Sequence, residues 1–141
     1  MPSKEELQQL ASLRLNEAKV LFDREFYEGA RYLSGYVVEL ALKARICTVL
    51  ELDKYPDSGG ISQSFKTHKL DDLLKLAGLE KQLKEVENNR NLSINWSTMS
   101  KWNESLRYSG IDDENKSVAE EFLKALQDKH GGVFNWIKKY W

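Results

Sequence analysis

A charged pair within an apolar helix is the first candidate for chemistry in this sequence. The run 26–51 predicts one long helix that is apolar almost all the way round. At about 100° per residue, Glu39 and Lys43 project into the apolar arc between Tyr32 and Tyr36. Such a pair is either a structural ion pair, with a tyrosine hydroxyl donating to Glu39, or part of a site in which Glu39 orients an arginine. We favour the structural ion pair.

The two histidines are further candidates, because histidine exchanges a proton near neutral pH. His68 follows Thr67, a residue that can cap a helix, so we expect His68 to pack and hydrogen-bond at a helix start. A catalytic role for His68 would require a partner acid within reach. His130 precedes two glycines and is expected to be solvent-exposed at a helix end. Since the only cysteine, Cys47, is predicted to lie in the core, no metal site and no cofactor are predicted.

Aromatic and arginine side chains form a second candidate group, made up of Trp96, Trp102, Arg107 and Tyr108. These side chains could stack bases and bind phosphate. They could equally fill the end of a helical bundle or a dimer interface, and we favour packing or dimerisation. The aromatic tail 133–141 is too apolar to remain in water, so it should pack on the bundle or on a partner chain.

Composition bounds the class of protein. The chain has 141 residues, 41% hydrophobic and 30% charged, which is typical of a single globular domain. With 21 basic and 22 acidic residues the net charge is −1, so nucleic-acid binding would need a local basic patch. The polar N-terminus does not resemble a secretory signal, and no apolar run approaches the roughly 20 residues of a membrane span. A cytoplasmic protein without a membrane partner is therefore predicted.

Helices must position these residues, because no strand-like alternation of useful length is present. Ser3 and Glu6 have capping-box spacing and predict the start of the first helix. A short break at 23–25 should fold it against the long second helix as an antiparallel hairpin. The segment 53–66 contains proline and glycines and is predicted to be a flexible loop.

Shorter helices should follow that loop. The first should run from Thr67 to Gly78, and residues Leu79, Leu83 and Val86 should continue helically. A break is expected over 88–95, because asparagine and serine compete with helix for backbone hydrogen bonds. A short helix should resume at Trp96, and the last should extend from residue 112 or 113 to the glycines at 131–132. The prediction is an all-α, antiparallel up-and-down bundle of four to five helices that forms one domain over residues 1–141.

Three stretches together resemble the HEPN superfamily of small helical bundles. They are FYEGARYLSGYVVELALKARI at 26–46, THKLDDLLKLAGL at 67–79, and NWSTMSKW at 95–102 followed by Arg107 and Tyr108. The similarity covers roughly residues 5–130 and preserves the order of the elements. It implies an antiparallel helical bundle and often a homodimer. Some members of the superfamily are ribonucleases, including toxins paired with a nucleotidyltransferase antitoxin, and others are inert binding or scaffolding modules.

The resemblance also implies where a nuclease site would lie. The ribonuclease branch carries an arginine followed five positions later by a histidine, which provide a cation for the phosphate and a base for the 2′-hydroxyl. The nearest match here is Arg90, but Asn95 stands in the place of the histidine. An amide does not accept a proton at neutral pH. Arg107 is an alternative equivalent of the family arginine. The resemblance implies that an acidic residue on the helix that carries Glu39 can assist this arginine in nuclease members.

We therefore expect a non-catalytic, HEPN-like binding or assembly module that forms a homodimer. Its partner would be a nucleotidyltransferase-like protein of a toxin–antitoxin or defence system. One alternative is a metal-independent ribonuclease with a variant site, in which Arg90 or Arg107 binds phosphate and Glu39 or His68 acts as the acid–base group. Another is an RNA- or nucleotide-binding domain without turnover. In each case Glu39 should lie within reach of Lys43, Arg90 or Arg107.

Overall fold

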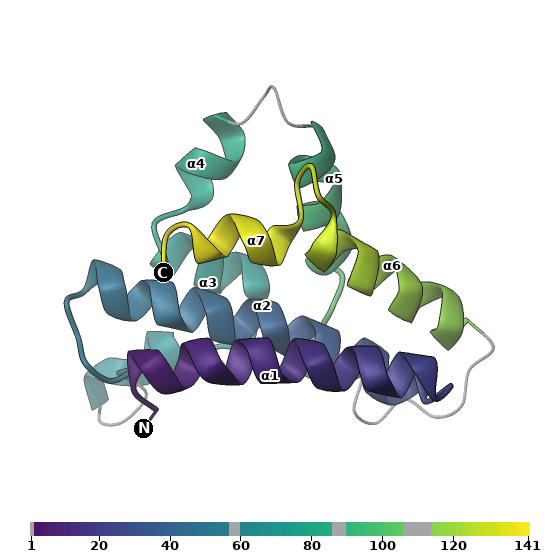
Figure 1. Ribbon diagram of the computed structural model, residues 1–141. Coiled ribbons are helices and arrows are strands. Elements are labelled where there is room, and N and C mark those ends of the chain that lie inside the picture. The colour runs from purple at the N-terminus through teal and green to yellow at the C-terminus, as the bar shows by residue number, and fades with distance from the viewer. Residues whose placement is uncertain (1, 57–59, 86–89, 106–113) are drawn as a thin grey trace.

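The computed structural model describes residues 2–56, 60–85, 90–105 and 114–141 (Figure 1). Regular structure in these residues is helical, which confirms the all-α prediction. The bundle is divided into more and shorter helices than expected. They are α1 (Lys4–Asp23), α2 (Tyr27–Val49), the 3-10 helix η1 (Gly60–Lys66), α3 (Leu70–Leu76), α4 (Glu80–Glu85), α5 (Arg90–Met99), α6 (Asn115–Gln127) and α7 (Val133–Lys138).

The first two helices form the predicted hairpin. The Ser3 hydroxyl accepts from the Glu6 backbone N–H at 3.1 Å, and the Glu6 carboxylate accepts from the Ser3 N–H at 2.7 Å, so the capping box is complete. The chain turns at Glu25, whose φ is +66°. Helix α2 then returns along α1 over its full length (Figure 1).

Helix α2 is the centre of the core. It contacts α1 along one side and also packs against α3, α6 and α7. This placement explains why its sequence is apolar almost all the way round, since a helix surrounded by protein has no solvent-facing stripe. Its buried side chains include Val37, Val38, Leu42, Ile46 and Cys47.

The segment expected as a flexible loop has an internal anchor. Tyr55 is fully buried, and its hydroxyl donates to the Phe65 carbonyl at 2.6 Å. The backbone N–H of Tyr55 also donates to the Pro2 carbonyl at 3.0 Å. In addition, residues 60–66 form η1 rather than open loop. The glycines and serines of this segment suggested a loop, whereas its two aromatic side chains, Tyr55 and Phe65, pack edge to face with 6.1 Å between centroids.

Helix α5 begins earlier than the sequence predicted. The structure has helix from Arg90 onward, where a break through Asn95 was expected. That expectation was wrong because the Asn95 amide donates across the bundle, to Asp128 and to the Gly131 carbonyl, instead of competing for its own backbone. The predicted cap at residue 112 or 113 lies outside the described residues.

The C-terminal tail packs on the bundle. Phe134, Trp136 and Ile137 of α7 are buried against α2 and α6. The tight turn before α7 requires Gly132, because a Cβ there would lie 2.6 Å from the Leu126 carbonyl oxygen. No helix in the described part of the chain has the length and apolar character needed to cross a bilayer.

Candidate functional site

Glu39 is the buried acid around which the first polar cluster is built. It is 2% exposed, and its Oε2 lies 3.3 Å from Nζ of Lys43 one turn later on α2. The expectation that Glu39 reaches Lys43 is therefore confirmed. Of the two tyrosines expected to donate to Glu39, Tyr32 donates instead to the Tyr36 hydroxyl at 3.1 Å.

His68 is a second partner of Glu39, and no pattern in the sequence indicated this contact. Its Nδ1 lies 2.9 Å from Oε1 of Glu39, and its Nε2 lies 3.3 Å from Oε2 of Glu104. The ring is thus held between a carboxylate of α2 and a carboxylate that follows α5. Glu39, Lys43, His68 and Glu104 are called the histidine cluster below. No spacing in the sequence signals it, because its members come from three separate parts of the chain.

Tyr36 borders the histidine cluster as a neutral phenol. Burial, followed by the contact with Tyr32 and the negative charges of Glu39 and Glu104, raises the pKa of Tyr36 well above its usual range. Tyr36 therefore adds no negative charge near neutral pH. Its ring meets the indole of Trp102 edge to face, with 5.1 Å between centroids.

Both tryptophans of the second candidate group are packed inside the bundle. Trp102 is 3% exposed and its indole N–H donates to the Tyr32 carbonyl at 2.9 Å. Trp96 is 7% exposed and donates to the Asp71 carboxylate at 3.2 Å. Neither ring offers a face for a base to stack on. Arg107 and Tyr108, the other members of that group, lie outside the described residues.

A cavity of about 670 Å³ opens beside His68 and is called the histidine cavity. It is lined by residues 66–72 at the start of α3 and 100–105 after α5. Lys66, Lys69 and Lys101 are among these residues. The cavity therefore combines a histidine, the partly exposed carboxylate of Glu104 and three lysines at one edge of the bundle.

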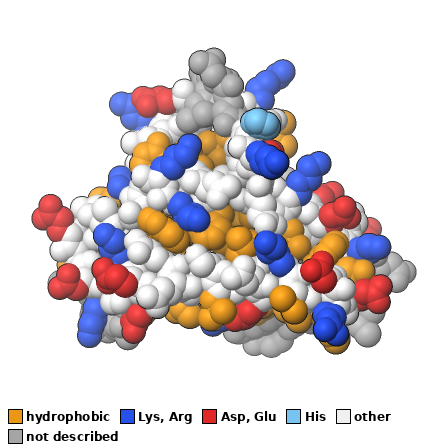
Figure 2. Space-filling view, in the orientation of Figure 1, with side chains coloured by type: hydrophobic (Ala, Val, Ile, Leu, Met, Phe, Trp, Pro, Cys, Tyr) orange, Lys and Arg blue, Asp and Glu red, His pale blue; other side chains and the backbone are white. Residues whose placement is uncertain are grey.

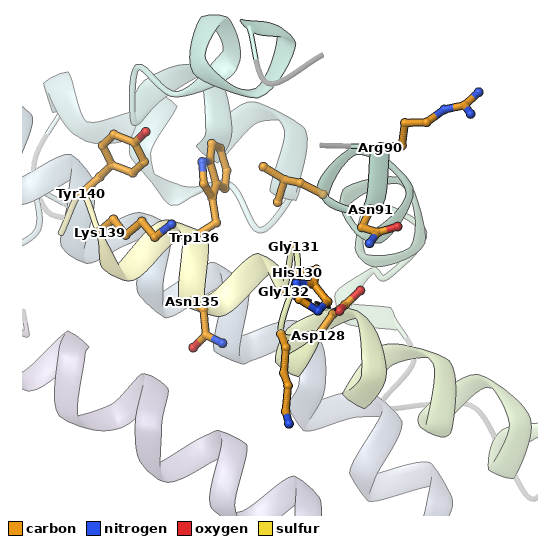
Figure 3. Close-up of a pocket in the computed structure, with 12 residues that line it drawn as sticks. Arg90, Asn91, Asp128, His130, Gly131, Gly132, Asn135, Trp136, Lys139 and Tyr140 are labelled. Carbon is orange, nitrogen blue, oxygen red and sulfur yellow. Dashed lines mark hydrogen bonds between the residues drawn. The ribbon is translucent and has the colours of Figure 1, made fainter. Parts of the chain in front are cut away.

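A second hollow, of about 690 Å³, lies between the start of α5 and α7 and is called the basic groove (Figure 3). Its lining includes the basic residues Arg90, Lys129, His130 and Lys139. In Figure 2, Lys and Arg side chains surround a histidine near the top of this face, whereas most acidic side chains lie along the lower half.

Asp128 is an acidic residue in the lining of the basic groove, and its carboxylate is hydrogen-bonded within the fold. It accepts from the His130 backbone N–H and from the Asn95 amide, each at 3.0 Å. These two bonds, that of His130 first, lower the pKa of Asp128 from its usual value. The carboxylate therefore stabilises the turn between α6 and α7.

The nuclease-like positions do not form a catalytic pair. Arg90 is exposed at the edge of the groove that it helps to line, and its guanidinium points away from the other labelled residues (Figure 3). Asn95 donates to Asp128 Oδ2 and to the Gly131 carbonyl, both at 3.0 Å, so both amide hydrogens are used within the fold. Glu39, the other acidic candidate, contacts Lys43 and His68 rather than Arg90.

Comparison with known proteins adds one finding. A family model described as HEPN domain matches residues 5–139, which is nearly the whole chain. Neither a curated protein nor a solved structure matches the chain. Within the part of the chain that the structure describes, no three His, Cys, Asp or Glu side chains are placed to hold a metal ion.

Proposed function

Because the chain belongs to the HEPN domain family, we propose that it is a non-catalytic binding module whose basic groove takes single-stranded RNA. The observation that carries this proposal is Asn95. The position that would hold the proton acceptor of a nuclease site holds an amide instead. Both of its hydrogens tie α5 to the turn before α7. This position can stabilise the groove but cannot deprotonate a 2′-hydroxyl.

The charges of the groove support an anionic ligand. Arg90, Lys129 and Lys139 form no ion pair with any other described residue. Trp136 also lines the groove, and its buried indole N–H has no hydrogen-bond acceptor in the described part of the chain. Unpaired cations attract a phosphate backbone and release its counterions, and the indole N–H is a spare donor for a phosphate or base oxygen.

Binding of a labelled single-stranded RNA, measured by fluorescence anisotropy at several salt concentrations, tests the proposal. We expect Arg90→Ala and Lys139→Ala each to weaken binding and to reduce the salt slope by about 0.7 for each phosphate that the variant no longer neutralises. Lys19→Ala, on the exposed face of α1, is the matched control and should behave as wild type. The RNA should remain uncut throughout. Equal affinity of all four proteins would refute binding in the groove.

Assembly with protein partners forms the second part of the proposal. The HEPN resemblance supports a homodimer and a nucleotidyltransferase-like partner from a toxin–antitoxin or defence setting. Sedimentation velocity over a range of concentrations should show a dimer, and co-expression with a nucleotidyltransferase encoded nearby should yield a co-purifying complex. A monomer at every concentration would contradict the homodimer.

A second candidate function rests on the histidine cluster. Nδ1 of His68 contacts a buried carboxylate at 2.9 Å, an arrangement that orients a general base. A ribonuclease of this kind would act through His68 and not through Arg90. Cleavage of mixed RNA by wild type and by Arg90→Ala, but not by His68→Ala, would favour this function over the non-catalytic module.

A further inference from the structure

We propose that the histidine cavity is a binding site for a phosphate or carboxylate group, and that the side chain of Glu104 occupies this site in the free protein. The site is separate from the basic groove, which lies between α5 and α7. Its volume of about 670 Å³ is that of a small-molecule site. The ligand would therefore be a small molecule that presents one anionic group to His68.

His68 lies between two carboxylates, and the form of its ring decides what it can bind. A neutral imidazole has one N–H, so it can donate to one carboxylate only. Here Nδ1 faces Glu39 at 2.9 Å and Nε2 faces Glu104 at 3.3 Å. The first of these contacts is a hydrogen bond, and the second becomes a charged contact only when the ring is protonated. A ring protonated at both nitrogens would present a charged N–H donor to an anion in the cavity.

The two carboxylates differ in exposure, and this difference indicates that Glu104 is the one that occupies the anion site. The Glu39 side chain is 3% exposed and also binds Lys43, so it is a fixed part of the protein. The Glu104 side chain is 44% exposed, lies farther from the ring, and has no second partner among the described residues. An exposed ion pair of this kind contributes little to stability. An incoming anion can therefore replace Glu104 at Nε2 at small cost.

The remaining charges of the cavity favour an anion. Lys66, Lys69 and Lys101 line it and form no ion pair with another described residue. Its two aspartates also line it, and each accepts a hydrogen bond, Asp71 from the Trp96 indole and Asp72 from the Thr67 hydroxyl. When Glu104 is displaced, the described lining holds three lysines against these two aspartates.

The charged and titratable groups around His68 come from each element packed against it. Those of α2 are Tyr36, Glu39 and Lys43, those before and within α3 are Lys66, Lys69, Asp71 and Asp72, and those after α5 are Lys101 and Glu104. Since the donor to the ligand is the protonated ring, anion binding should be weaker wherever the ring has lost its proton.

Ring resonances of the two histidines give a direct test, because His68 lies in the histidine cavity and His130 in the basic groove. Inorganic phosphate and sodium acetate are titrated into the ¹⁵N-labelled full chain, with His130→Gln used to assign the signals. We expect both anions to shift the His68 resonance. Glu104→Gln should bind roughly two- to fivefold more tightly, which is the factor that an exposed ion pair represents. Glu121→Gln, an exposed carboxylate on α6, should bind as wild type.

The pH dependence is measured with acetate, because acetate keeps its charge from about pH 6 to 8. A change in binding over this range then reports the protein and not the ligand. The effect of acetate on His68 should be weaker at the higher pH. A His68 resonance that neither anion moves, in wild type and in Glu104→Gln, would overturn the site. Equal affinity of these two proteins would overturn the role of Glu104. Shifts confined to His130 would support the basic groove and reject the cavity.

Discussion

Asn95 donates both hydrogens of its side-chain amide within the fold, and this sets what the residue can do. One bond reaches Asp128 and the other the Gly131 carbonyl, so the amide fixes the turn that shapes the basic groove. The resemblance alone identified position 95 as the departure from the nuclease pattern. Only the structure shows that Asn95 stabilises the turn before α7 through these two hydrogen bonds.

Replacing Asn95 by alanine should reduce stability without creating or removing an activity. Two hydrogen bonds disappear and the Gly131 carbonyl is deprived of a donor, so we expect the free energy of unfolding to fall by about 1–3 kcal/mol. Urea unfolding monitored by circular dichroism measures the change. Ser93→Ala, on the exposed side of the same helix, is the control and should alter stability by less than about 0.5 kcal/mol.

Glu39 allows a direct comparison of a buried and an exposed ion pair. Glu39→Ala leaves Lys43, whose side chain is 13% exposed, without its carboxylate, and we expect a loss of about 3 kcal/mol. Glu85→Ala removes the carboxylate partner of Lys81 in an i,i+4 pair whose side chains are 62% (Glu85) and 82% (Lys81) exposed. This change should lower the free energy of unfolding by less than about 1 kcal/mol. Similar losses in both variants would show that Glu39 behaves as a surface residue.

At the scale of elements, the segment that follows α5 packs on α2 at Gly35, a residue that has no side chain. A Cβ at Gly35 would lie 1.9 Å from an atom of the Trp102 ring, so the indole fills the space that any other residue would need. The docked tryptophan is then fixed by its bond to the Tyr32 carbonyl. This contact positions the segment that carries Glu104.

Gly35→Ala should therefore be destabilising even though alanine favours helix. Overpacking a closed contact costs about 1–3 kcal/mol, which exceeds the gain of up to about 1 kcal/mol from helix propensity. Gly29→Ala on the same helix is the matched control, since its Cβ would meet only the flexible end of Leu21 at 3.1 Å. Thermal unfolding should place the Gly35 variant below wild type and the Gly29 variant near it.

Local signals in the sequence predicted the elements that depend on neighbours along the chain. The capping box at Ser3 and the break before α2 are of this kind, and both are confirmed. The start of α5, the burial of Tyr55 and the partner of His68 depend on groups distant in sequence. Spacing carries no information on such contacts, so the histidine cavity could not be predicted from the residue types that form it.

At the scale of the whole molecule, α2 is enclosed by α1, α3, α6 and α7, and Cys47 lies within that enclosure at 1% exposure. Burial is the main cause that raises the pKa of the Cys47 thiol. The thiol is therefore both inaccessible and protonated in the folded protein. Its reaction with a thiol reagent must await an opening of the bundle.

The labelling rate of Cys47 should consequently report the stability of the whole fold. We expect slow reaction with a disulfide reagent at pH 8 in buffer and a rate that rises with urea in parallel with global unfolding. The Glu39→Ala and Gly35→Ala variants should label faster, in the order of their loss of stability. Rapid labelling of wild type at a rate independent of urea would contradict the buried position.

The bridge between the start of α1 and the segment after α2 has a consequence for motion. The Lys4 N–H donates to the Asp53 carbonyl and the Tyr55 N–H to the Pro2 carbonyl, each at 3.0 Å. The terminal turn of a helix ordinarily frays and exchanges its amide hydrogens quickly. Here two backbone hydrogen bonds hold the start of α1 against the segment that follows α2. We therefore expect the first turn of α1 to fray less and its amide hydrogens to exchange more slowly than those of an ordinary helix end.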